Sequence, residues 1–509
     1  MIARSSFVRV SGWSSSTGWV PFAVLSGALA AAIVIPTSYM ALTLLGMIAA
    51  AIIVRSRLDS GTLAVVFLAV VAAIPAQLVV PGLGSLGSPQ IIVSLAALGA
   101  WFVTWLSPND NWADRYRPVP ILIAIFVAAN LASFGAAGLR PTDALESSAA
   151  DRGLIIVLAS AGIALLIAES VSSRDRLDVV VKGMVLAGTA IACVGIIQFA
   201  SGYDLAANVR LPGLQSTTND AAFITTRSIF RRVSGTTVHA IEFSAVLCIV
   251  FPAALYLALY QRRRWFISVA LIGIALPMSV SRTAVVGIGI GALVLVLAWP
   301  RSYRRKFYAF TVLYLVAMRL MIPGLLGTIR ALFVDAGADP SVSSRTTDYE
   351  YVDKFVAERP LFGRGFATFI PTRYDFLDNQ YLLSLVETGY VGVSAYLLLL
   401  AGGMFVAYRV RRRSTDDRDR GLAQALMASL AVVGFTSFTF DFLSFPTARA
   451  MLFTAVGCVG ALWRFTSDAA TTAPNRRSPQ LEVTHSTHVR RNNGIGATPS
   501  KALGLEPPR

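Results

Sequence analysis

The stretch QRRRWFISVALIGIALPMSVSRTAVVGIGIGALVLVLAWPRSYRRK, residues 261–306, contains the pattern that decides the fold. Two apolar runs, 265–280 and 283–299, are joined by a turn so short that Arg282 must sit at the membrane edge. Arginine-rich joints stand on both sides of this hairpin. Because basic loops stay on the cytoplasmic side of a membrane, the pattern predicts two spans that leave the cytoplasm and return to it.

The same alternation continues over most of the chain. Several of the predicted spans have only about 16–17 residues, close to the lower limit for a helix that crosses about 30 Å of hydrocarbon. The runs are too long and too uniformly apolar for barrel strands. The sequence therefore predicts an all-α polytopic membrane protein with about 12–14 transmembrane helices. The predicted spans are residues 20–35, 39–54, 62–80, 89–106, 119–137, 153–170, 179–201, 239–260, 265–280, 283–299, 307–323, 381–406, 421–440 and 447–463.

Arginine placement predicts the orientation of these spans. With the N-terminus inside, the joint after each even-numbered span faces the cytoplasm, and both termini are cytoplasmic. The short outer joints are nearly uncharged, and Pro81–Ser88 has no charged residue. We therefore expect a multi-pass protein of the cell membrane. The basic residues of the inner joints are Arg55, Arg57, Arg115, Arg117, Arg174, Arg176, Arg262, Arg263, Arg264, Arg301, Arg304, Arg305, Lys306, Arg409, Arg411, Arg412, Arg413, Arg418 and Arg420.

Composition argues against other classes of protein. The chain has 509 residues, of which 55 % are hydrophobic and 14 % charged, whereas an ordinary soluble domain is about 25 % charged. The net charge of +16 is spread over loops and the tail without interleaved aromatic residues. Attraction to anionic lipid explains this charge better than binding of nucleic acid does. We expect no cofactor and no metal, because the three cysteines lie within apolar runs and the His485–His488 pair lies in the tail without further ligands.

The chain divides into a cytoplasmic N-terminal segment, 1–19, a polytopic membrane domain, 20–464, and a tail, 465–509. The tail is rich in Pro, Asn, Ser, Thr and Arg, which predicts a disordered cytoplasmic extension. Three outer segments of the membrane domain are too long to be turns, and long loops in compact proteins are usually functional or disordered. These segments are Gly138–Arg152, Gly202–Val238 and the large extracytoplasmic loop 324–380.

The largest outer loop carries a helical pattern. Thr347 and Glu350 have the spacing of a capping box, and apolar residues then recur at helical spacing until Pro360. This pattern predicts a short amphipathic helix that lies over the outer face.

The segment RRVSGTTVHAIEFSAVL, residues 231–247, enters the eighth predicted span. It places Arg231, Arg232, His239 and Glu242 near the outer boundary, with His239 and Glu242 on one helix face. His239 is either a boundary residue hydrogen-bonded to a loop or a functional group. Arg282 in the next hairpin is either an arginine that extends its head towards water or an anion clamp, since guanidinium binds phosphate with two parallel hydrogen bonds.

Two further blocks surround the re-entry of the largest loop into the membrane. They are ERPLFGRGFATF, residues 358–369, and DNQYLLSLVETGYVG, residues 378–392. The second block places Asp378 and Asn379 at the start of a span. Glu387 lies about 13 Å deeper and on the opposite helix side, so we expect it to pack or form hydrogen bonds with the glycines around it.

In order and in wording, these blocks resemble the O-antigen ligase/polymerase superfamily of polytopic glycan transferases. A span entry with His239 comes first, followed by the Ser281-Arg282 hairpin and a large outer loop. The loop passes through P-L-x-G-x-G-x-x-x-F to a [H/D]-N-x-Y-L…E-x-G-x-x-G helix. The resemblance covers about residues 231–406, and more loosely the whole membrane domain.

The resemblance implies a C-type glycosyltransferase-like membrane fold. It also implies a polyprenyl-pyrophosphate-linked oligosaccharide donor and a glycan acceptor that react on the outer face, without metal or nucleotide sugar. A flippase and a chain-length regulator are candidate partners. In the ligases a histidine begins the last motif, and Asp378 stands there in this chain. The difference favours polymerisation of repeat units of a surface or exopolysaccharide over ligation to a lipid or protein acceptor.

In the reaction that this implies, an acceptor hydroxyl attacks the anomeric carbon and charge builds on the departing pyrophosphate. We expect arginines to neutralise that charge, first Arg282, then Arg231, Arg232, Arg345 and Arg364, with Tyr381 beside the glycan. Asp378 is the expected proton acceptor, next to Asn379. His239 is a rival base with a more suitable ordinary pKa.

A flippase or small-solute transporter is the alternative from another class. Its signature would be charged residues at mid-membrane depth and paired discontinuous helices. This chain instead gathers its polar residues at the outer ends of the predicted spans, with Arg319 and Glu387 as partial exceptions.

Overall fold

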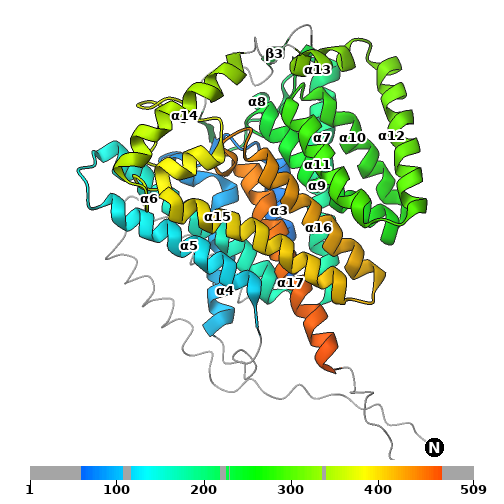
Figure 1. Cartoon of the computed structure of the whole chain (residues 1–509), viewed down its shortest axis with the longest axis horizontal. Helices are drawn as coiled ribbons and strands as arrows, with labels where there is room; N and C mark the ends of the chain where they lie inside the picture. The colour runs from blue at the N-terminus through cyan, green and yellow to red at the C-terminus, as the bar shows by residue number, and fades with distance from the viewer. Residues whose placement is uncertain (1–58, 107–115, 218–224, 228–229, 335–339, 473–509) are drawn as a thin grey trace, which may run out of the picture. The chain divides into compact units, whose positions relative to one another are not determined.

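The computed structural model describes residues 59–106, 116–217, 225–227, 230–334 and 340–472. The first two predicted spans and the tail beyond Thr472 lie outside these ranges. Within them the chain is mostly helical, and each predicted span from 62–80 onward overlaps a helix (Figure 1). The bounds differ in places, since α3 ends at Ala73 and α6 begins at Ala144, inside the segment predicted as an outer loop. The predicted class, an all-α polytopic membrane protein, is confirmed. The long helices are α3 (Ser60–Ala73), α4 (Pro89–Leu106), α5 (Pro118–Ala137), α6 (Ala144–Leu165), α7 (Arg174–Ser201), α9 (Ala240–Tyr260), α10 (Phe266–Met278), α11 (Arg282–Ala298), α12 (Arg301–Met321), α13 (Leu325–Val334), α14 (Pro340–Glu358), α15 (Gln380–Arg413), α16 (Asp417–Thr436) and α17 (Pro446–Thr472).

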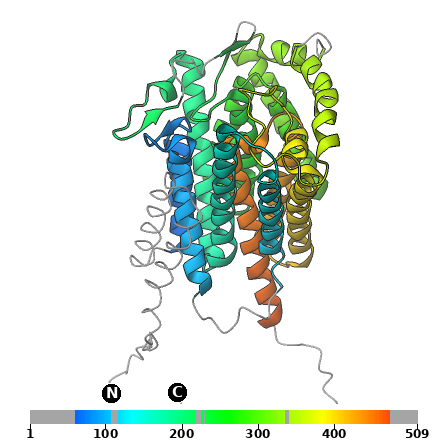
Figure 2. The same cartoon turned by 90° about the vertical axis from the view of Figure 1, so that its left-hand side faces the viewer.

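Among the described residues, six helices are long and apolar enough to cross a membrane. They are the helical stretches Pro118–Ala137, Ala144–Ser170, Arg174–Ser201, Ala240–Tyr260, Gln380–Arg413 and Pro446–Ser467. Three shorter apolar helices, Ser60–Ala73, Pro89–Trp105 and Arg282–Ala298, accompany them. The long helices lie side by side and roughly parallel (Figure 2), as expected for a protein that satisfies its backbone inside a bilayer.

Helix α9 forms the centre of the helix bundle. It contacts α7, α10, α11 and α16, and nearly all its side chains are buried. Small residues on α7 permit this close packing, since a Cβ on Gly188 would collide with Val250 and one on Gly195 with Phe243. Close contact between small residues is the usual way in which helices associate where lipid is as apolar as the helix surface.

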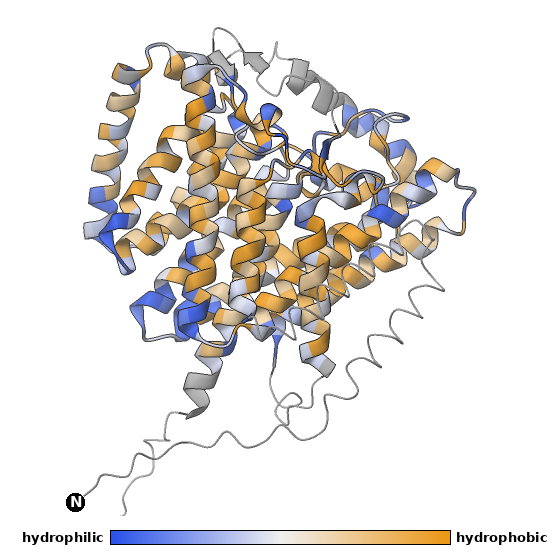
Figure 3. Ribbon diagram, turned by 180° about the vertical axis from the view of Figure 1, so that it is seen from behind, coloured by the Kyte–Doolittle hydropathy of each residue, from blue (hydrophilic) through white to orange (hydrophobic). Residues whose placement is uncertain are grey.

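One end of the bundle, the arginine-rich end, carries the joints 116–117, 171–173, 261–265, 299–300 and 414–416. Several of its charges form ion pairs, within a helix or between segments. Arg117 contacts Glu169 at 3.0 Å, and Arg174 contacts Asp178 at 2.6 Å and Asp419 at 2.7 Å. Figure 3 shows apolar residues along the helices and hydrophilic residues gathered towards their ends.

The opposite end, the loop end, carries the described parts of 74–88, 138–143, 202–239, 279–281, 322–379 and 437–445. Two short pairs of antiparallel strands lie at this end. Strand β1 (Leu78–Val79) pairs with β2 (Gln215–Ser216), and β3 (Thr225–Arg227) pairs with β4 (Phe230–Arg232). The 3-10 helices η2 (Gly84–Gly87) and η6 (Phe442–Ser444) and the short helix α8 (Leu205–Asn208) also lie here. At the arginine-rich end, the π-helical turn η3 (Leu166–Ser170) extends α6 and the 3-10 turn η4 (Arg263–Trp265) precedes α10.

The helix predicted in the largest outer loop is present as α14, but its predicted start is wrong. It begins at Pro340, so Thr347 and Glu350 lie inside it rather than at its cap. Proline suits the first turn of a helix because its missing N–H would have no partner there. Val352 and Val356 face a small core with Phe369, Leu377 and other residues. This core attaches α14 to the beginning of α15.

Candidate functional site

Backbone hydrogen bonds join the two sequence blocks, residues 358–369 and 378–392, to each other. Helix α15 breaks at Gly389, where φ is 63°. Tyr390 N donates to Pro360 O at 2.8 Å, and Arg364 N donates to Val386 O at 2.9 Å. Gly365 N donates to Glu387 O at 2.8 Å. The loop thus satisfies backbone groups that the broken helix leaves without partners, as buried backbone requires.

Two glycines make this fit possible. A Cβ on Gly363 would collide with the backbone of Glu387, and one on Gly389 would collide with the carbonyl of Leu361. Both glycines have positive φ, 66° and 63°, which other residues rarely adopt. The glycines of both motifs therefore serve the architecture that supports the site.

Glu387 lies at this junction. Its Oε1 accepts a hydrogen bond from Phe369 N at 3.2 Å, and its carbonyl accepts one from Ser133 Oγ at 3.0 Å. The side chain is buried. This agrees with the packing and hydrogen-bonding role predicted for it.

Asp378 lies directly before α15, against the connection between α16 and α17. Asn379 caps α15, and its Oδ1 accepts from Tyr381 N at 2.9 Å. The next residue, Gln380, donates its backbone N–H to Ser437 O at 2.9 Å and to Phe440 O at 3.1 Å. These contacts bring Asp378 beside residues 437–445.

The Ser281-Arg282 hairpin reaches the same connection. Arg282 is the first residue of α11, and the hydroxyl of Thr283 is 3.1 Å from that of Thr439. Arg232 Nε donates to Ser279 O at 3.3 Å. Arg232, Arg282 and Asp378 therefore all adjoin the segment 437–445 or the hairpin bound to it.

His239 caps α9. Its Nδ1 accepts a hydrogen bond from Ile241 N at 3.2 Å, which leaves the ring proton of the neutral imidazole on Nε2. Burial, together with the charge of Arg232, lowers the pKa of His239 to about 4. The ring is therefore neutral near pH 7 and suited to donate a hydrogen bond rather than to accept a proton.

A cavity of about 440 Å³ opens beside these residues. Charged side chains on its wall come from α6, the largest loop, α15 and the α16–α17 connection. The lining residues are Ser85, Ala149, Arg152, Gly153, Ile156, Val238, Ala367, Phe369, Ile370, Pro371, Asp375, Phe376, Leu377, Leu383, Glu387, Asp441, Ser444, Phe445 and Pro446.

Asp441 is a buried acid outside the helical spans. It is 7 % exposed, and its Oδ1 has no hydrogen-bond partner. Burial raises its pKa to about 7, and the nearby carboxylates of Asp378 and Glu242 act in the same direction. Sequence reasoning missed Asp441 and Arg152. Asp441 does have a signal, since it is the single charged residue in the aromatic outer joint SFTFDFLSF, 437–445.

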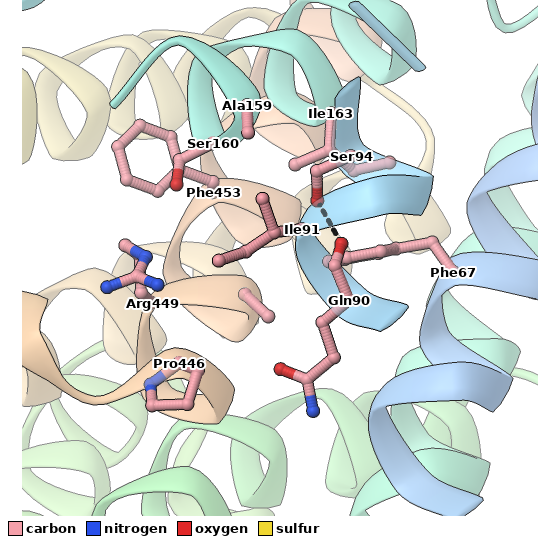
Figure 4. A pocket seen from close by; sticks show the side chains of 11 residues that line it. Phe67, Gln90, Ile91, Ser94, Ala159, Ser160, Ile163, Pro446, Arg449 and Phe453 are labelled. Carbon is pink, nitrogen blue, oxygen red and sulfur yellow. Dashed lines mark hydrogen bonds between the residues drawn. The ribbon is translucent and has the colours of Figure 1, made fainter. Parts of the chain in front are cut away.

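A second, smaller cavity of about 20 Å³ adjoins the first, and Pro446 lines both. Figure 4 shows Gln90 and Arg449 on its wall. The amide of Gln90 is buried without a partner, while Arg449 donates to Leu443 O. A cavity of this size holds about one water molecule.

The other predicted site residues are Arg231, Arg345, Arg364 and Tyr381. Arg364 donates to the hydroxyl of Tyr374 at 2.7 Å and lies 3.8 Å from Glu146, so it belongs to an ion-pair cluster. Tyr381 donates its hydroxyl to Gly434 O at 2.6 Å. The side chains of Arg231 and Arg345 lie outside the described part of the structure. In the ranges that the structure covers, no group of three or more His, Cys, Asp or Glu could hold a metal ion.

The fold and site define a polytopic membrane protein with a polar site at one end of its helix bundle. The family model described as O-Antigen ligase matches residues 266–397. The predicted resemblance to the O-antigen ligase/polymerase superfamily is thereby confirmed. The match supports a glycan transferase of this type, with the lipid-linked glycan substrates that such a family implies. No curated protein was found to match the chain.

Proposed function

We propose that the protein polymerises repeat units of a surface or exopolysaccharide from polyprenyl-pyrophosphate-linked oligosaccharides. In this proposal the loop end faces the extracytoplasmic side of the cell membrane and both termini are cytoplasmic. The family match supports the reaction type. The basic joints at the opposite end support the orientation.

The observation that carries the proposal is the convergence of Arg232, Arg282 and Asp378. They come from three segments that are distant in sequence, and all adjoin the α16–α17 connection or the hairpin bound to it. Cations and a carboxylate from segments that adjoin the same connection suit the breaking of a sugar–pyrophosphate bond. The arginines would bind the departing pyrophosphate, whose charge grows during the reaction.

Asp378 would take part in removing the proton from the acceptor hydroxyl. His239 is a poor rival for this role, because its lowered pKa makes it a weak base. It would instead donate from Nε2 to a glycan or phosphate oxygen. Asn379 would keep Asp378 in place by capping α15. We assign Arg364 a supporting role, because its guanidinium is bound to Glu146 and Tyr374.

The experiment is complementation of a deletion strain with wild-type protein, Asp378→Asn or Arg282→Ala. We expect loss of polymer with normal amounts of inserted protein, and accumulation of single lipid-linked repeat units outside the membrane. Long polymer that is no longer joined to its final acceptor would indicate a ligase. Absence of any lipid-linked unit on the outer face would indicate a flippase. Normal polymer length and yield in Asp378→Asn would refute the proposed site.

A further inference from the structure

We propose that Asp441 is a second catalytic carboxyl, which shares the proton of the acceptor hydroxyl with Asp378, and that the 440 Å³ cavity beside it binds the acceptor sugar. This inference rests on the proposed function. It adds a residue and a substrate-binding site that neither the motifs nor the family match assigns, since Asp441 lies beyond residues 266–397.

The chemistry of the cavity wall fits a sugar. Sugar rings have C–H-rich faces and hydroxyl edges. The wall supplies aromatic side chains from Phe369, Phe376 and Phe445, and charged side chains from Arg152 and Asp441. Its volume lies within the range of about 300–1,000 Å³ that is usual for small-molecule sites. Acids and an arginine interrupt the apolar part of the wall, and such a mixed lining suits a sugar better than an isoprenoid tail.

Asp441 has unused hydrogen-bonding capacity at the cavity. It lies on the cavity wall, and its buried Oδ1 has no hydrogen-bond partner. A buried polar atom without a partner destabilises the fold. A sugar hydroxyl in the cavity would donate to this oxygen and remove that penalty.

The backbone places Asp441 next to Asp378. Gln380, two residues after Asp378, donates to the carbonyl of Phe440, which directly precedes Asp441. The like charge of Asp378 disfavours ionisation of Asp441. Two carboxyls that share a site bind one proton more tightly than either would alone.

The other charged groups near Asp441 come from several elements. Glu242 on α9 is a buried carboxyl that acts electrostatically on Asp441, and Asp441 in turn acts on the buried carboxyl of Glu387 on α15. Arg152 on α6 is on the wall of the same cavity, and Arg449 on α17 binds the carbonyl of Leu443. Glu242 is engaged in capping α17 through Thr447 N at 2.7 Å and Ala448 N at 3.1 Å. Glu387 is engaged by Phe369 N.

The step balances without a further reactant. The O–H bond of the acceptor breaks, and its electron pair forms the new bond to the anomeric carbon of the donor. The bond from that carbon to the pyrophosphate oxygen breaks, and its electron pair leaves with the pyrophosphate. The proton passes to the carboxyl pair and stays on Asp441. A base with a pKa near the working pH is the most effective.

The test measures kcat/KM against pH for the full-length protein in nanodiscs. The probe is the lipid-linked repeat unit extracted from the deletion strain. For the wild type, we expect the rate to fall as the pH drops below about 7, where Asp441 becomes protonated. Asp441→Asn should lose about 100-fold or more of the rate and the acid limb near 7. Asp441→Glu should keep more activity than Asp441→Asn, with a shifted acid limb.

Asp417→Asn is the matched control, because that side chain is 80 % exposed at the arginine-rich end. It should leave the rate and the pH profile unchanged. An active wild type with an equally active Asp441→Asn and an unchanged acid limb would overturn this inference alone. A wild type that does not extend the probe would overturn the proposed function as well. If Asp441→Asn does not accumulate, an unchanged acid limb in Asp441→Glu is the contradicting result.

Discussion

The two ends of the bundle differ in whether their charged side chains are paired. At the arginine-rich end, Arg174 is held between Asp178 and Asp419, and Arg117 contacts Glu169. At the loop end, Asp441 lies buried beside other carboxyls, with one oxygen that lacks a partner. Paired charges stabilise a fixed geometry, whereas a buried acid with a shifted pKa marks a candidate for chemistry.

Two buried acids at the loop end, Glu146 and Asp441, also differ in their hydrogen-bond and ion-pair partners. Glu146 is buried as deeply as Asp441, but it binds Arg140 at 2.6 Å and accepts from the hydroxyl of Tyr374 at 2.8 Å. Arg364 and Arg373 lie near the same carboxylate. We conclude that the Glu146 cluster is scaffold, and that the region around Asp378 and Asp441 is the site.

Removal of the scaffold acid should have the largest effect on stability. Glu146→Ala leaves Arg140 buried without its partner, and breaking a buried ion pair in this way typically costs about 3–5 kcal/mol. We expect low amounts of folded protein, measured by fluorescence size-exclusion chromatography after heating in detergent. Glu358→Ala is the control, since that side chain is 66 % exposed and 3.9 Å from Arg364. Equal stability of both variants would show that the cluster is not scaffold.

The second-largest effect should come from a substitution at the break in α15. Gly389→Ala forces a Cβ onto the carbonyl of Leu361 at a positive φ, and this backbone conformation alone costs a non-glycine residue about 1–3 kcal/mol. The loop should detach from the helix, with loss of polymer and reduced thermal stability. Gly289→Ala on α11, where a Cβ meets nothing within 4 Å, should preserve both. A fully active Gly389→Ala variant would contradict the role given to the interlocked motifs.

Arg282→Lys tests whether the loop end binds an anion. Lysine keeps the charge but cannot form two parallel hydrogen bonds to phosphate. We expect about a tenfold lower kcat/KM, which corresponds to about 1.4 kcal/mol, with unchanged thermal stability. The assay is extension of the lipid-linked repeat unit. Wild-type kinetics in this variant would show that Arg282 does not bind phosphate and only positions the hairpin at the membrane edge.

The smallest effect should come from an exposed pair at the arginine-rich end. Arg176 contacts Asp59 at 3.1 Å, and its side chain is 42 % exposed. Exposed pairs contribute about 0.2–1 kcal/mol, so Arg176→Ala should change thermal stability little and polymer yield not at all. A large loss of polymer would show that the two ends do not divide structure and chemistry as proposed.

Much of this protein follows from local sequence. Apolar run length predicted the helices α3 to α7, α9 to α12 and α15 to α17, and the order of four short motifs predicted the family resemblance that residues 266–397 confirm. These features can be read locally because each depends on neighbouring residues and on the bilayer as solvent. The start of α14 was wrong, since Pro340 begins the helix ahead of the capping-box pair.

The pairing of side chains was decided by the tertiary structure. The sequence predicted Arg364 as an arginine that binds pyrophosphate, but the fold places it beside Glu146, which lies more than two hundred positions away in the chain. The break at Gly389 and its fit with Leu361 depend on two segments meeting. Asp441 became a candidate only where its burial, its missing partner and its neighbour Asp378 could be seen together. Burial and electrostatic coupling depend on distances in space, and a single sequence specifies them only through the complete fold.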